Sequence, residues 1–229
     1  MRVRDQVRRA AIVTAGAALA AVLGATGPTP SSAASTPPTQ ITAVHAMPGT
    51  PAVTVYQNGG VLIRRLNTGT VAGPITVNPG TYSYAVRPRT AAASSAPLVA
   101  ISGVRLITGE HASLVAGFTA TGQRKIWVSP NPQSAVPSGK ARLIVRHVAA
   151  AGAIDMYVGS TMKVSGLVNG MQATSIVSAG TKSIKVDLHN SSAAVIGPVN
   201  YTLRAGTTTV LYVIGASATT TLGFATQRY

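Results

Sequence analysis

The most constraining feature of this sequence is a short pattern that occurs twice, about a hundred residues apart. The first copy runs from His45 to Gly59 and contains a Gly/Pro-rich bend, an alternating segment and a turn glycine. The second copy runs from His147 to Gly159 and keeps the histidine, the alternation, a tyrosine and the glycine. Solenoid repeats are only about 20–50 residues long. A repeat near one hundred residues therefore indicates a duplicated domain.

The first copy predicts a bend that is followed by a β-hairpin. Pro48 and Pro51 lack the backbone N–H that a continuous strand uses, so the chain is expected to turn there. The segment from Val53 to Tyr56 alternates in the manner of a strand with two different faces. Asn58-Gly59 is the strongest short hairpin signal, and residues 60–66 are the expected return strand.

Both units continue as short alternating segments with turn signals every 8–12 residues or so, and neither contains a convincing helix pattern. Gly80 in the first unit and Gly180 in the second each precede such a segment. The predicted fold class is all-β, with two tandem antiparallel β-sandwiches of the immunoglobulin or transthyretin type. The predicted boundaries are 41–129 for the first sandwich, 130–139 for a proline-rich linker and 140–229 for the second sandwich.

Residues 1–34 have the pattern of an export signal. Four arginines precede Ala10, an alanine-rich apolar run extends to Leu23, and Ser32-Ala33-Ala34 supplies the small residues that a signal peptidase reads. The apolar run is shorter than the roughly 20 residues of a membrane span. We interpret it as a cleaved signal peptide, with an uncleaved anchor as the alternative, and residues 35–40 as a spacer. The mature chain, without a second apolar span, is expected to be secreted by a bacterium and either released or associated with the cell wall.

The chain is strongly basic. It has 19 Lys and Arg residues against 4 Asp and Glu residues, a formal net charge of +15, and the part after the leader remains near +12. This balance favours polyanions such as anionic wall polymers. The basic residues are dispersed and lack the interleaved aromatic residues of nucleic-acid-binding proteins, so no nucleic-acid partner is expected. The absence of cysteine excludes disulfides, thiolate metal sites and a cysteine nucleophile.

His45 and His147 are the candidates for chemistry. A histidine at a strand end can act as a general base or a metal ligand, but zinc needs three or four ligands. Glu110 in the first unit does not align with Asp155 or Asp187 in the second. Three acids after the leader are too few for a duplicated glycosidase, and no G-x-S-x-G or phosphate-binding loop occurs. We therefore expect no enzyme activity, cofactor or metal. The preferred interpretation is two buried histidines whose rings hydrogen-bond to the backbone.

Four aromatic residues raise a second possibility, a platform on which sugars stack. Tyr82 and Tyr84 share their strand parity with Val86, so packing in the core is the preferred interpretation. Tyr56 and Trp127 are the other two members of this group.

The first copy resembles a known family. Residues Val44 to Tyr56, followed by Pro79-Gly80-Thr81-Tyr82, are similar to the V-H-A-S-P-D-A-P-x-V-D-V-Y and P-A-G-T-Y motifs of the DUF4397 family. The resemblance implies an extracytoplasmic bacterial protein with tandem domains and no assigned biochemical function. Gly49 and Thr54 stand where the family often has Asp. The motif positions, interpreted as structural, are His45, Pro48, Pro51, Val53, Val55, Tyr56, Gly59, Gly80, Tyr82, His147, Asp155, Tyr157 and Gly180.

Together these observations favour a secreted, non-enzymatic protein that serves as an interaction or structural module of the cell envelope. The expected partners are anionic cell-wall polymers or surface glycans. A carbohydrate-binding or adhesin-like module is the alternative. The sequence does not indicate a particular ligand or an oligomeric state.

Overall fold

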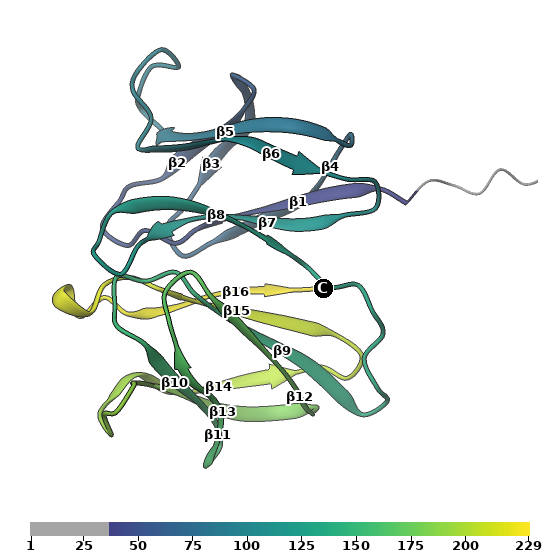
Figure 1. Ribbon diagram of the computed structural model, residues 1–229, viewed down its shortest axis with the longest axis vertical. Helices are drawn as coiled ribbons and strands as arrows, with labels where there is room; N and C mark the ends of the chain where they lie inside the picture. The colour runs from purple at the N-terminus through teal and green to yellow at the C-terminus, as the bar shows by residue number, and fades with distance from the viewer. Residues whose placement is uncertain (1–36) are drawn as a thin grey trace, which may run out of the picture. The chain divides into compact units, whose positions relative to one another are not determined.

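The computed structural model describes residues 37–229, so the expected signal peptide lies outside the described residues. The described part of the chain is almost entirely β-structure, as the alternating pattern predicted (Figure 1). Its one helical element is the short 3-10 helix η1 (Ser217–Thr219). No helix in residues 37–229 is long and apolar enough to cross a membrane.

The first half of this region is a pair of four-stranded sheets with the strand orders β4-β1-β7-β8 and β3-β2-β5-β6. The first strand begins two residues inside the segment that was predicted as a spacer. The strands are β1 (Thr39–His45), β2 (Val53–Gln57), β3 (Gly60–Leu66), β4 (Val71–Val77), β5 (Gly80–Pro88), β6 (Val99–Leu106), β7 (His111–Phe118) and β8 (Arg124–Pro130).

The second half repeats this topology, with strand orders β12-β9-β15-β16 and β11-β10-β13-β14. Strands β1 to β8 correspond in order to β9 to β16, as expected of a duplicated domain. The all-β class with two sandwiches is thereby confirmed. The strands are β9 (Lys140–His147), β10 (Ile154–Val158), β11 (Thr161–Leu167), β12 (Gln172–Ser178), β13 (Gly180–Leu188), β14 (Ala194–Leu203), β15 (Thr208–Ile214) and β16 (Gly223–Arg228).

The predicted hairpin of the first copy forms between β2 and β3. β2 ends at Gln57 and β3 begins at Gly60, so Asn58 and Gly59 are the two loop residues. Both have positive φ values, 47° and 81°. This is the left-handed geometry that a two-residue hairpin of type I′ requires, and Asn and Gly adopt it most readily.

One strand pair in each half is parallel. β1 lies parallel to β7 and β9 lies parallel to β15, whereas the other pairs are antiparallel. Each parallel pair forms the centre of its sheet. The sandwiches were predicted to be antiparallel, and these two pairs correct that prediction. Alternation reports which face a residue occupies and not the direction of the neighbouring strand.

The two sheets that contain these parallel pairs are covered on both faces. One face packs on the second sheet of the same sandwich, in cores built around Leu114 and Leu143. The opposite faces share a third apolar cluster that includes Val44 and Val115 from the first half and Ile144 and Tyr212 from the second. For this reason every residue of β15 is buried. The two sandwiches accordingly belong to one compact unit.

The segment between β8 and β9 was predicted as a proline-rich linker. Two side chains of β9 bind it to the second sandwich. Arg142 donates through Nη1 to the Ser134 carbonyl at 3.0 Å and through Nη2 to the Ser134 hydroxyl at 2.9 Å. Arg146 Nη2 donates to the Pro130 carbonyl at 2.6 Å. The path of the chain from one sandwich to the other is thus held by hydrogen bonds.

Candidate functional site

The first candidate residue, His45, lies fully buried at the end of β1. Its Nε2 is 3.1 Å from the Pro51 carbonyl oxygen, on the far side of the Gly/Pro bend. The Thr68 hydroxyl lies 3.3 Å from the same nitrogen but donates its proton to the Thr50 carbonyl at 2.6 Å. Burial lowers the pKa of His45, although the hydrogen bonds to the bend oppose this change. The ring is therefore a neutral donor that fastens the bend to the strand.

His147 occupies the equivalent place at the end of β9 and is also fully buried. Its Nε2 lies 2.8 Å from the Gly152 carbonyl oxygen, and the Ala149 N–H donates to Nδ1 at 3.4 Å. Burial lowers the pKa of His147 as well. Within residues 37–229 neither histidine pairs with an acid. Each ring is therefore placed to anchor the loop that follows its strand.

The second sandwich holds two aspartates on one sheet surface. Asp155 and Asp187 are directly opposite each other on β10 and β13. The Gly166 N–H donates to Asp155 Oδ1 at 2.7 Å, and His189 Nδ1 lies 2.9 Å from the same oxygen. Lys185 Nζ lies 2.7 Å from Asp187 Oδ2. Burial by itself raises the pKa of Asp155, but the Gly166 N–H and His189 outweigh it and the pKa lies below its ordinary value.

This acidic pair belongs to the second half alone. The corresponding residues of the first half, opposite each other on β2 and β5, are Thr54 and Arg87. The duplication therefore does not carry a shared catalytic or ligand set at this position. Among the described residues, no three His, Cys, Asp or Glu side chains converge as a metal would require.

The aromatic residues do not gather on one exposed face. Tyr84 is buried in the first core, and Tyr82 packs against the same core at its edge. Tyr56 is buried beneath the Arg87 guanidinium, whose carbon lies 4.8 Å from the ring centroid. Trp127 packs against the cluster between the two sandwiches. These positions supply packing and cation–π contacts rather than a common platform for sugar stacking.

The sequence did not point to the most extensive polar network, which lies between the sandwiches. Ser113 on β7 lies 3.0 Å from Asn131 Oδ1 and 2.9 Å from Gln227 Oε1. The Tyr212 hydroxyl donates to Gln227 Oε1, and Arg146 Nη1 donates to the Tyr212 oxygen at 3.0 Å. All five side chains are buried. Groups from both halves thus satisfy one another, as polar groups in an interior must.

The guanidinium of Arg146 is the unusual member of this network. Its side chain is only 2% exposed, yet no carboxylate of residues 37–229 pairs with it. Its donors go instead to Gln172 Oε1 at 2.8 Å, to the Tyr212 hydroxyl and to the Pro130 carbonyl. These contacts satisfy its hydrogen bonds but leave a net positive charge in a low-dielectric region.

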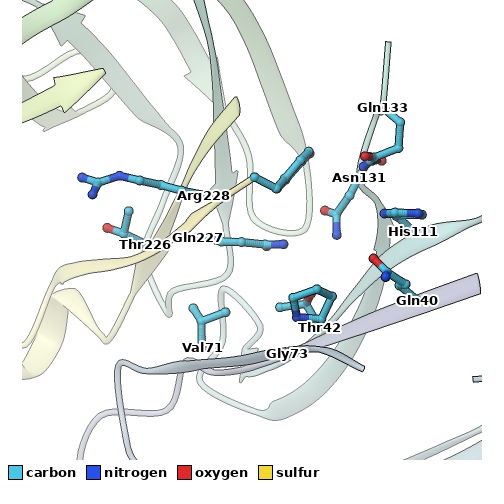
Figure 2. Close-up of a pocket in the computed structure, with 12 residues that line it drawn as sticks. Gln40, Thr42, Val71, Gly73, His111, Asn131, Gln133, Thr226, Gln227 and Arg228 are labelled. Atoms are coloured by element: carbon cyan, nitrogen blue, oxygen red, sulfur yellow. Dashed lines mark hydrogen bonds between the residues drawn. The ribbon is translucent and has the colours of Figure 1, made fainter. Parts of the chain in front are cut away.

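A cleft of about 250 Å³ opens beside this network, between strands β1, β4 and β7 of the first half and β16 of the second (Figure 2). Its walls combine amide, hydroxyl and imidazole groups with the apolar side chains of Val71 and Pro74. Arg228 also lines it, and no acidic side chain does. The lining residues used below are Gln40, Thr42, His111, Asn131, Gln227 and Tyr229. Burial raises the pKa of Tyr229 to about 12, so its phenol stays protonated and neutral at physiological pH.

The sequence of β9 contains the arginines of this network, but their pattern does not distinguish a buried face from a solvated one. Arg142, Ile144 and Arg146 share one strand face, and a face with two arginines is typical of a solvated surface. The structure covers this face with the other sandwich and the segment before β9. Only the covering elements reveal that these arginines are buried.

Comparison with known proteins gives one family match. A family model described as "Domain of unknown function (DUF4397)" matches residues 39–157. The match begins at the first residue of β1, spans the whole first sandwich and ends within β10, inside the second copy of the motif. No curated protein matches the chain. Because the model covers more than half of its length, the chain belongs to the DUF4397 family.

Proposed function

We propose that this chain is an exported, non-enzymatic module of the bacterial envelope that associates with anionic polymers through its positive surface. The observation that carries this proposal is how the chain uses its few acids. Asp155 and Asp187 are buried and engaged with His189 and Lys185. Glu110 accepts a hydrogen bond from the Ile107 N–H at 3.0 Å. Each of these three acids is therefore held by a hydrogen bond or an ion pair within the protein.

The basic residues are used in the opposite way. Of the lysines and arginines in residues 37–229, only Lys185 forms an ion pair. Arg142 and Arg146 are buried, and the others are exposed or half-buried on both sandwiches. Unpaired surface cations attract polyanions over a distance that is set by the Debye length. A module of this kind would bind by charge density rather than by one shaped pocket.

The absence of enzymatic activity is part of the proposal. The two histidines that the sequence singled out are sealed from solvent and serve the bends that follow β1 and β9. Asp155 Oδ1 accepts from the Gly166 N–H and Asp187 Oδ2 pairs with Lys185, while Asp187 Oδ1 has no partner among the described residues. The two buried histidines lack the accessible nucleophile–base or acid–base geometry that general catalysis needs.

A salt series on an immobilised polyanion tests the proposal. Residues 35–229 should be retained on poly(glycerol phosphate) resin at low ionic strength. About 0.3 M NaCl should release them, because it shortens the Debye length to several ångströms. R64Q/R65Q, which removes two exposed charges of β3, should elute at lower salt than the parent chain. R64K/R65K keeps both charges and is the matched control, and it should elute with the parent.

Two results would contradict the proposal. Equal elution of the Gln and Lys variants would show that surface charge does not carry retention. Retention that persists in salt and is released by a free neutral sugar would instead support the carbohydrate-binding alternative.

A further inference from the structure

The cleft beside the inter-sandwich network has hydrogen-bond donors in its wall. Ser113 lies beside the Asn131 amide oxygen, and Tyr212 donates to the Gln227 amide oxygen. Arg146 donates to the Tyr212 oxygen, and the single Tyr212 proton can reach either Ser113 Oγ, 2.9 Å away, or Gln227 Oε1. When Ser113 donates to Asn131, donation from Tyr212 to Gln227 satisfies both amide oxygens. Both amide oxygens are therefore turned inward and occupied, which leaves both NH2 groups on the cleft side.

These two NH2 groups have no partner within the described residues. No hydrogen bond of residues 37–229 uses Asn131 Nδ2 or Gln227 Nε2, and neither nitrogen is sealed from solvent. Figure 2 shows the Asn131 and Gln227 side chains extending toward one another from opposite sides of the cleft. Arg228, the next residue of β16, points away from Gln227 in the same view.

The charge behind this wall favours an anionic ligand over a neutral one. Arg146 is buried without a carboxylate, and Arg142 on the same face of β9 is bound only to neutral groups. The chain of hydrogen bonds from Arg146 through Tyr212 to Gln227 polarises the Gln227 amide and strengthens its free N–H groups as donors. The cleft is also smaller than the 300–1,000 Å³ or so of drug-sized sites, which suits one small group.

We propose that this cleft binds a single oxyanion, a carboxylate or a phosphate, between the Asn131 and Gln227 side-chain amides. Gln40, His111 and Thr42 line the remaining wall and supply further polar contacts. The inference rests on the proposed function and deepens it, because the oxyanion would be one anionic group of the envelope polymer. The dispersed surface charge would gather the polymer, and the cleft would hold one of its repeating groups.

Side-chain NMR of the parent chain tests the site without any substitution. Residues 35–229, tagged at the N-terminus and labelled with ¹⁵N, are titrated in separate arms with inorganic phosphate, acetate and glucose. The NH2 signals of Asn131 and Gln227 should move saturably with phosphate or acetate and stay in place with glucose. The exposed Gln123 on the β7–β8 turn is the internal control and should not saturate. Asn131 and Gln227 shifts no larger than those of Gln123 would overturn the proposal, and so would saturation with glucose alone.

Charge-matched variants give the second test. N131D and Q227E replace a donor NH2 with an acidic oxygen and keep an acceptor for Ser113 or Tyr212. Each should weaken phosphate binding by about tenfold or more, because a donor becomes a repelling group. R64Q changes the net charge by the same amount at an exposed position of β3, outside the residues that line the cleft, and it should bind phosphate within about twofold of the parent. If all three variants weakened phosphate binding equally, net charge alone would explain the effect and the inference would be overturned.

The outcomes separate the two proposals. Salt-sensitive retention on the polyanion without movement of the two NH2 signals would leave the proposed function standing and remove the cleft site. Movement of the signals without retention would support an oxyanion site and remove the polymer module. Circular dichroism of N131D and Q227E identifies a variant that has not folded, and the titration of the parent chain then decides.

Discussion

Single residues carry distinct tasks that their chemical type alone did not reveal. His45 and His147 each use Nε2 to hold a backbone carbonyl of the bend that follows their strand. Two rings in the same role at the same place in both halves account for the histidine of the repeated motif. Their value to the fold depends on their being neutral, because burial penalises the imidazolium.

This neutrality predicts a dependence of stability on pH. The pKa of each histidine is lowered by folding, so below the ordinary value of about 6.5 the unfolded chain binds more protons than the folded chain. The free energy of unfolding should therefore be full above pH 7 and fall as the pH decreases toward 5, by at most about 1.4 kcal/mol per pH unit for each histidine. Urea titrations at pH 7.5, 6.5 and 5.5 measure it.

The variant H45Q/H147Q should flatten this pH dependence, because a glutamine amide can donate to the bend but does not titrate. The single variants H45Q and H147Q are the matched controls: each should remove part of the slope, and the two reductions should add up in the double variant. An unchanged slope in H45Q/H147Q would show that other groups set the acid sensitivity.

At the scale of elements, the hairpins and strands follow local rules, whereas one close approach between the sandwiches depends on a glycine. A Cβ at Gly117 of β7 would lie 2.7 Å from the Val148 carbonyl oxygen, in the segment after β9. The same atom would lie 3.2 Å from the Trp127 ring. Gly117 is therefore required for space, and the backbones of β7 and of the second sandwich meet through it.

G117A should destabilise the protein by about 1–3 kcal/mol, the range for overpacking a filled interior. G152A is the matched control, because a Cβ at Gly152 meets no atom within 4 Å and its φ is not in the left-handed region. It should change stability by about 0.5 kcal/mol or less. Urea unfolding of the two variants checks the difference, and similar losses in both would show that the approach at Gly117 is not tight.

At the scale of the whole molecule, the two sandwiches share an apolar cluster and a buried hydrogen-bond network. Val44 and Val115 pack with Ile144 and Tyr212 in this cluster, and Ser113 reaches Gln227 across the junction. If one half unfolded alone, the other half would expose the apolar area of this cluster to water and leave polar groups of the network without partners. The halves are therefore expected to depend on each other for stability.

Equilibrium unfolding should accordingly be a single transition. Trp127, the one tryptophan of the chain, lies at the junction, so its fluorescence reports the separation of the sandwiches. Far-ultraviolet circular dichroism reports the strands of both halves. The two urea curves should coincide within error, as two-state unfolding requires. A fluorescence change that precedes the loss of circular dichroism would show that the halves separate before they unfold.

Much of this fold could be predicted from the sequence because its signals are local. Asn58-Gly59 has the φ values that its hairpin needs, and the alternation after Gly80 places Tyr84 and Val86 in the core. The repeated motif corresponds to the same strands in both halves. Local chemistry fixes such features because a turn or a strand face depends on neighbours within a few residues.

The sequence by itself determined the strand content, the duplication and the excess of positive charge. Tertiary structure alone decided that β1 and β7 run parallel, that Arg142 and Arg146 are buried, and that Asn131 and Gln227 face one cleft. These features join residues far apart in the chain, and their side chains have the same local pattern whether water or a second sandwich covers them. The packing of the two halves buries a strand face whose sequence is typical of a solvated surface. The same packing brings polar residues that are dispersed in the sequence together into a candidate site.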